Sequence, residues 1–138
     1  IILLRLFGAN IGSNNLFKPR VNIKYPWNLK TGDNVWIGEM VWIDNLDKVI
    51  ISDNVCISQG AMLLTGNHDY NKKSFNLITK TIIIHEGVWI AAKAIVCPGV
   101  ICGEHSVLSV NCVATSNLEP YTIYKGNPIS AIKVRKIN

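Results

Sequence analysis

Residues 31–43 read Thr31-Gly32-Asp33-Asn34-Val35-Trp36-Ile37-Gly38-Glu39-Met40-Val41-Trp42-Ile43, with a β-branched residue at every sixth position. The step of six continues along most of the chain, with a short pause after Ile43 and a long one after Leu63. Only Thr31 is polar among the members of the series, which are Thr31, Ile37, Ile43, Ile51, Ile57, Leu63, Ile84, Ile90, Val96, Cys102, Leu108 and Ala114. Nine of the twelve residues that lie four positions after these are also apolar, and most of them are small.

A period of six fits neither an α-helix nor the two-residue alternation of a long strand. It fits very short strands separated by tight corners, each strand pointing one aliphatic side chain inward. Gly, Asn and Asp recur one to three positions after the aliphatic residue, where they tolerate the left-handed backbone angles of a corner. Three steps of six close a coil of about 18 to 20 residues, which predicts an all-β solenoid of parallel strands.

Length and composition favour one packed domain. The 138 residues are 49% hydrophobic and 17% charged, a balance that argues against disorder. We expect a single domain over 1–138, with coils over about 11–118, an extruded loop over about 64–83 and a tail over 119–138. No run approaches the roughly 20 apolar residues that cross a bilayer, so we expect no membrane span. The chain begins with Ile1 rather than Met, and we expect that part of the N-terminus has been removed.

The net charge and the spacing of the cysteines limit which ligands, metal sites and disulfides the sequence predicts. The formal charge of +5 suits an anionic ligand such as a phosphorylated cofactor, but it is too dispersed to predict nucleic-acid binding. Cys56, Cys97, Cys102 and Cys112 form no C-x-x-C pair, so neither a zinc module nor a disulfide framework is predicted. Reduced thiols in a cytoplasmic protein are the expectation.

The interruption of the repeat between Leu63 and Ile84 contains the candidate catalytic residue. Here the step grows from six to 21, so a segment leaves the coil as a loop, and long loops in compact domains are often functional. His68 sits at the root of this loop, where the scaffold can hold it in place. An imidazole can take up and return a proton near neutral pH, so His68 is the candidate general base.

The sequence resembles the hexapeptide-repeat acyltransferases in four features. These are the six-residue repeats, here called hexads, the loop string Gly66-Asn67-His68-Asp69-Tyr70, the run from Val88 to Val100 and the closing Gly126-Asn127-Pro128. The loop is particularly similar to that of the acetyltransferases associated with colanic acid and other exopolysaccharides. The resemblance implies a left-handed parallel β-helix and transfer of an acetyl group from acetyl-CoA to a sugar hydroxyl, with His68 as the base. It also implies homotrimers with active sites between subunits.

The same resemblance suggests how acetyl-CoA is held. Ala92 and Val110 occupy equivalent hexad positions on successive coils, where small residues would admit the pantetheine arm. A backbone N–H near Ala92 would face the thioester oxygen, a donor that can be worth roughly 3 kcal/mol to a developing oxyanion. His68 of one subunit would then work with Ala92 and Val110 of the next.

Cations near the end of the chain are candidates for the cofactor phosphates. Lys133 and Arg135 follow the closing motif, and Lys93 or Lys125 are further possibilities. Two departures from the family pattern, Ser116 and Ser130, stand where relatives often carry basic residues, so the phosphates are held less tightly or by other groups.

Acceptor contacts are predicted less sharply. Asp44 lies one coil before His68 on the same face, and we expect it to position the substrate, with Asp69 as the second choice. Trp27 falls on an inward position, which predicts core filling. Trp36 and Trp42 fall on outward positions and line either an acceptor cleft or an interface.

Two alternatives remain open from the sequence. A γ-carbonic-anhydrase-like enzyme would need His68, His85 and His105 to converge on zinc. A β-helical binding scaffold without catalysis would tolerate the Ser116 and Ser130 departures. The acceptor, and whether it offers a hydroxyl or an amine, is not predicted.

Overall fold

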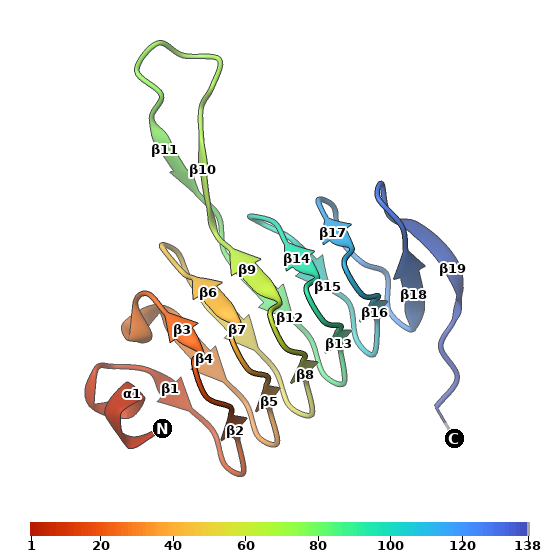
Figure 1. The fold of residues 1–138 in the computed structure, drawn as a ribbon, viewed down its shortest axis with the longest axis horizontal. Helices are drawn as coiled ribbons and strands as arrows, with labels where there is room; N and C mark the ends of the chain where they lie inside the picture. Colours follow the sequence, from red (N-terminus) through yellow and green to blue (C-terminus); the bar gives the residue numbers. More distant parts are fainter. Residues whose placement is uncertain (138) are drawn as a thin grey trace.

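The computed structural model describes residues 1–137, which wind into a solenoid of short parallel strands (Figure 1). The coils follow one another in sequence order from the end that holds α1 (Ile2–Leu6) to the end that holds β19, and one hairpin projects from the stack. The predicted class is therefore confirmed, with one short helix added. No helix within residues 1–137 has the length and apolar character needed to span a membrane.

Three sheets, parallel except for β19 at one edge, form the sides of the solenoid. The first, sheet A, contains β1 (Asn10–Ile11), β4 (Leu29–Thr31), β7 (Val49–Ile51), β12 (Ile82–Ile84) and β15 (Ile101–Cys102). Sheet B contains β2 (Leu16–Phe17), β5 (Trp36–Ile37), β8 (Cys56–Ile57), β13 (Trp89–Ile90), β16 (Val107–Leu108), β18 (Thr122–Lys125) and β19 (Ser130–Val134). Sheet C contains β3 (Asn22–Ile23), β6 (Trp42–Asp44), β9 (Met62–Leu64), β14 (Ile95–Val96) and β17 (Val113–Ala114).

The hexad residues stack in columns along the solenoid axis. In sheet B, for example, Ile37 pairs with Ile57, Ile57 with Ile90, and Ile90 with Leu108. These four side chains are 0% exposed, and the matching columns of sheets A and C are buried as well. Because successive side chains in a strand point to opposite faces, the neighbouring residue of each strand points outward.

Two corners of every coil use a left-handed residue three positions after the inward hexad residue. The positive φ angles at these corners fall at Asn14, Arg20, Asn34, Met40, Asn54, Gly60, Gly87, Lys93, His105, Asn111 and Tyr121, and Gly99 adds a third such corner to one coil. Asn and Gly were the residue types expected there. Arg20, Met40, Lys93, His105 and Tyr121 adopt the same conformation, so the closure of the coil imposes it on side chains that do not favour it.

The boundaries of the loop and the tail differ from the expected ones. Leu64 still belongs to β9, and the chain is back in the coil at Ile82, so the excursion is shorter than 64–83. Its arms pair as an antiparallel hairpin of β10 (Gly66–His68) and β11 (Leu77–Thr79). In the tail, β18 stacks in parallel on β16 as a further rung, and β19 pairs antiparallel with β18 at the edge of the sheet.

The prediction that Trp27 fills the core is wrong. A 3-10 helix over Pro26–Asn28 carries Trp27 outward, where it is 60% exposed, and Leu29 occupies the inward position instead. Trp36 and Trp42 point outward as expected and are 45% and 47% exposed.

Strand β7 offers a direct test of this register, because Ile51 is 1% exposed while Ile50 lies on the outer face of the same strand. We expect Ile51→Ala to lower the free energy of unfolding by about 3 kcal/mol through lost burial and a cavity, and Ile50→Ala by less than half of that. Chemical denaturation of both variants measures the difference. Equal losses, or a larger loss for Ile50→Ala, would mean that the inward and outward faces are exchanged.

Candidate active site

The hairpin that carries His68 is fixed to the coil by hydrogen bonds at its base. The buried Thr65 hydroxyl donates to the Asp44 carbonyl at 3.0 Å and accepts the Asp47 N–H at 3.0 Å. The Thr81 hydroxyl donates to the Asp47 carboxylate at 3.1 Å, and the Lys80 N–H donates to the Thr65 carbonyl at 2.9 Å. Both ends of the excursion are thereby tied to the preceding coil, so its base is held by the scaffold.

His68 ends the first arm of the hairpin with its ring held on one side. Its Nδ1 lies 2.9 Å from the Phe75 carbonyl oxygen, and the two rings stack with centroids 4.3 Å apart and planes 5° apart. Because a carbonyl can only accept, Nδ1 carries the proton in the neutral ring and Nε2 keeps its lone pair. The side chain is exposed, so this lone pair is available to a bound molecule.

The two predicted carboxylates lie near the hairpin but have cationic partners of their own. Asp44 Oδ1 is 3.0 Å from Lys24 Nζ, an ion pair that lacks the directional geometry of a hydrogen bond. Asp69 Oδ2 is 3.2 Å from Lys72 Nζ within the hairpin. The His68 ring is thus oriented by a main-chain carbonyl, and the positioning of substrate by Asp44 or Asp69 stays a prediction.

A groove of about 560 Å³ lies on the outer face of sheet B and its corner toward sheet C. All five residues predicted to contact the cofactor line it: Ala92, Val110, Lys125, Lys133 and Arg135. Ser58, Gln59 and Trp89 also line it, and the sequence analysis missed them. The repeat offered a signal for Gln59, because the pairing of Cys56 with Trp89 and of Trp89 with Val107 places Gln59, Ala92 and Val110 in one column.

Each corner in that column leaves one amide unused. Beside Ala92, the Ala91 N–H donates to the Leu108 carbonyl and the Lys93 N–H to the Gln59 carbonyl. Within residues 1–137, no protein acceptor is found for the N–H of Ala92 or of the equivalent Val110. The groove is therefore bordered by main-chain donors that a ligand can use.

The cationic side chains along the groove differ in their exposure and in their hydrogen bonds. Lys125 and Lys133 are exposed. Arg135 is partly buried, and its guanidinium donates to the Gly87 carbonyl at 2.8 Å and the His105 carbonyl at 3.2 Å. Arg135 therefore anchors the tail against two coils, and its charge lies beside the groove.

His68 and the groove occupy different edges of one chain. The hairpin leaves the solenoid between sheet C and sheet A, whereas the groove lies on sheet B, and His68 is not among its lining residues. The structure therefore separates His68 from Ala92 and Val110 within a single chain.

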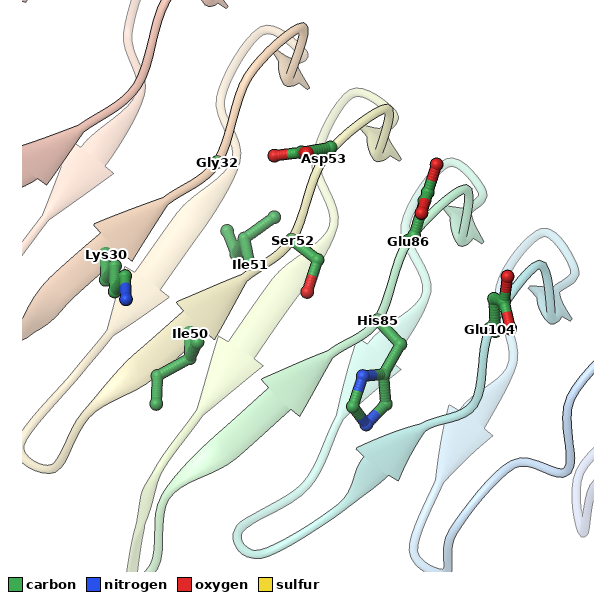
Figure 2. Close-up of a pocket in the computed structure, with 9 residues that line it drawn as sticks. All are labelled: Lys30, Gly32, Ile50, Ile51, Ser52, Asp53, His85, Glu86 and Glu104. Atoms are coloured by element: carbon green, nitrogen blue, oxygen red, sulfur yellow. The ribbon is translucent and has the colours of Figure 1, made fainter.

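A second groove, of about 540 Å³, crosses the outer face of sheet A (Figure 2). Its lining mixes charges of both signs, from Lys30 to Asp53, Glu86 and Glu104, and the His85 ring lies on the side of its coil that faces the coil of Glu104. His105 lies elsewhere, against Tyr121 with ring centroids 5.0 Å apart. No three His, Cys, Asp or Glu side chains of residues 1–137 group closely enough to bind a metal, so the zinc alternative lacks its ligand set within one chain.

Three of the four cysteines are unsuited to act as an alternative nucleophile. Burial raises the pKa of the Cys102 thiol to about 12 and raises the pKa of Cys56 and of Cys97 in the same direction. The thiolate is the reactive form, so these three thiols are poor nucleophiles at neutral pH.

The chain has relatives of known class, although no family model matches it. It is 38% identical over 133 residues, 96% of this chain and 73% of the relative, to WcaF of Escherichia coli, a protein named as an acetyltransferase of colanic acid biosynthesis. It is 30% identical over 139 residues, 99% of this chain and 68% of the relative, to the galactoside O-acetyltransferase of Escherichia coli.

Solved structures confirm the fold. A hexapeptide-repeat acetyltransferase of Vibrio cholerae in complex with acetyl-CoA superposes with a TM-score of 0.91 at 24% identity, over 99% of this chain and 76% of that one. A galactoside acetyltransferase in complex with coenzyme A gives a TM-score of 0.90 at 24% identity, over 98% and 69% of the two chains. The solenoid is thus the left-handed parallel β-helix that the hexads predicted by resemblance.

The carboxylate of Asp47, at the base of the hairpin, should make the stability of the fold depend on pH. The Lys48 N–H, followed by the Thr81 and Thr79 hydroxyls, holds the pKa of Asp47 below its usual 3.8 against a partial effect of burial. A lowered folded pKa gives stability that is complete above about pH 4 and is lost as the pH falls through the folded pKa. We expect Asp47→Asn to unfold more easily at pH 7, by about a few tenths of a kcal/mol because the group is partly open to solvent, and the difference to close in acid.

Urea titrations of both proteins across this pH range measure the effect. Thr81→Val is the matched control, because it removes one donor and leaves the Lys48 N–H in place, so part of the pH dependence should remain. An Asp47→Asn difference that is the same at every pH would contradict the assignment.

Proposed function

This chain belongs to the hexapeptide-repeat acetyltransferases, and on that premise we propose that it moves an acetyl group from acetyl-CoA to a hydroxyl of a sugar or polysaccharide precursor. Its similarity to WcaF and to the galactoside O-acetyltransferase supports a saccharide acceptor. We place the reaction in the cytoplasm, in agreement with the four free cysteines of the described chain.

His68 is the general base of this proposal, and the observation that carries it is the contact between Nδ1 and the Phe75 carbonyl. With Nδ1–H committed to that carbonyl, Nε2 takes the proton of the acceptor hydroxyl while the hydroxyl oxygen attacks the thioester carbon. The carbon–sulfur bond then breaks, and Nε2 returns the proton to the departing thiolate. The products are the acetyl ester and coenzyme A, and no covalent enzyme intermediate is required.

The size, main-chain donors and cations of the groove on sheet B support acetyl-CoA as its ligand. Its volume of about 560 Å³ lies within the usual range of about 300 to 1,000 Å³ for small-molecule sites. The unused N–H groups of Ala92 and Val110 suit the amide carbonyls of the pantetheine arm and the thioester oxygen. Lys125, Lys133 and the charge of Arg135 suit the phosphates.

The separation of His68 from the groove supports sites shared between subunits. A flat-sided solenoid can close a ring of identical copies, and a homotrimer would bring the hairpin of one copy to the groove of the next. The hairpin carries exposed apolar residues for such a contact, with Tyr70 75%, Phe75 56% and Leu77 54% exposed. Asp44, at the hairpin base, is placed to position the acceptor, with Asp69 as the second choice.

We expect His68→Ala to lower kcat/KM by at least about 100-fold, because the loss of a positioned base costs two to four orders of magnitude. The assay follows acetyl transfer from acetyl-CoA by mass spectrometry across a panel of hydroxyl and amino sugars. His85→Ala is the matched control and should retain native rates. His85 is also an exposed histidine, but it lies on sheet A, away from the groove on sheet B. Equal rates for His68→Ala and the native protein would remove the base from the mechanism.

A shared site also predicts complementation between two inactive variants. We expect His68→Ala to lack the base and Val110→Trp to fill the groove, so that each alone is inactive. Mixed oligomers made by co-expression with two different tags should recover up to about a quarter of native activity, since some interfaces then combine an intact His68 with an intact groove. Mixed oligomers with no recovery would show that both parts must come from the same chain.

A further inference from the structure

The net positive charge of the chain lies in residues 1–32, which form α1, the first coil and β4 of the second coil. Residues 1–32 contain Arg5, Lys18, Arg20, Lys24 and Lys30 and no Asp or Glu, so they carry the whole net charge of +5. The remaining residues hold nine Lys or Arg and nine Asp or Glu, which cancel. The coils stack in sequence order (Figure 1), so this segregation along the sequence becomes a segregation along the axis, with one cationic end.

The same end exposes an apolar surface. In α1 and the residue after it, Ile2 is 77%, Leu3 66%, Leu6 77% and Phe7 58% exposed. Only Leu4 of the helix packs against the core. We call this surface, together with Trp27, the apolar cap.

Trp27 continues the apolar cap beyond the helix. It is 60% exposed, its ring stands 5.1 Å from that of Tyr25, and a side chain added at Gly8 would meet Trp27 Cβ at 3.0 Å, so it borders the end of the helix segment. Trp and Tyr are enriched where proteins meet the membrane–water interface, because their rings combine an apolar body with a polar tip.

Two lysines lie beside the apolar cap, and Arg20 is a further exposed cation of the first coil. A groove of about 320 Å³ beside Trp27 is lined by both Lys30 and Lys48. Arg20 and Lys30 are exposed and form no ion pair within residues 1–137. Arg5 and Lys24 are engaged, with the Ile11 carbonyl and with Asp44 respectively.

We propose that the N-terminal end of the solenoid docks on an anionic lipid surface, with the apolar cap in the interface and Arg20 of the first coil, Lys30 of the second and Lys48 of the third near the headgroups. Apolar area together with attraction to anionic lipid is what determines binding of such peripheral surfaces. The absence of any acidic residue in 1–32 favours this occupant over a second copy of the chain, whose first coil would carry the same positive charge. The inference does not depend on acetyl transfer.

Co-sedimentation of the purified chain with lipid vesicles tests the proposal. We expect at least about tenfold tighter binding to vesicles of phosphatidylcholine with phosphatidylglycerol than to phosphatidylcholine alone. Binding should weaken when NaCl rises from about 0.05 M to about 0.5 M, because salt screens the charges. Equal binding to both vesicle types, or none to the anionic vesicles at low salt, would overturn the proposal.

Variants separate the two contributions. Arg20→Glu with Lys30→Glu should weaken anionic-vesicle binding at least about tenfold, and Leu3→Gln with Leu6→Gln should weaken it at both salt concentrations. Lys73→Glu with Lys136→Glu makes the same change in net charge at exposed positions outside the first coil and should bind like the native chain. Circular dichroism confirms that each variant is folded.

Two outcomes would identify a different occupant. The Lys73→Glu, Lys136→Glu control could lose as much binding as Arg20→Glu with Lys30→Glu. That result would mean that net charge alone is responsible for binding. Concentration-dependent self-association that Leu3→Gln with Leu6→Gln abolishes, without vesicle binding by the native chain, would assign the apolar cap to a second copy. Either result contradicts the proposal.

Discussion

The structure depends on one constraint, which is that nearly every short strand of the coils must point at least one apolar side chain at the solenoid axis. The columns of Ile, Val and Leu that result are almost completely buried, and they fix the register of all three sheets. A shift of one residue would exchange the inward and outward faces of a strand. Corner conformation follows from the same constraint, because at two corners of each coil the chain turns three residues after the inward position whatever residue stands there.

Both parts of the candidate site are consequences of that register. Equal steps place Gln59, Ala92 and Val110 above one another, and the unused amides of their corners line one groove. Interrupting the step once releases a hairpin, and hydrogen bonds from Thr65 and Thr81 hold its base. The scaffold thus sets the position of a ligand groove on one side and of an imidazole on another, which is an arrangement suited to completion by a neighbouring copy.

The sequence predicted features that depend on side-chain type and spacing. The hexads gave the solenoid, its interruption located His68, and the repeat placed Ala92 and Val110 on successive coils. Features that depend on main-chain geometry were not predictable: any residue at position 75 supplies the carbonyl that orients His68, and Arg135 is anchored by two carbonyls. Trp27 was misplaced because a 3-10 turn shifts the inward position to Leu29. The charge was judged dispersed because only the stacking of coils turns residues 1–32 into one end of the molecule.

A crystal structure of the oligomer with coenzyme A bound tests the central claim most directly. The account predicts the pantetheine arm against Ala92 and Val110 of one subunit, with the sulfur beside Nε2 of His68 from the adjacent subunit. His68 Nδ1 should remain on the Phe75 carbonyl. Coenzyme A bound along sheet A, or a sulfur atom far from every His68 ring, would contradict it.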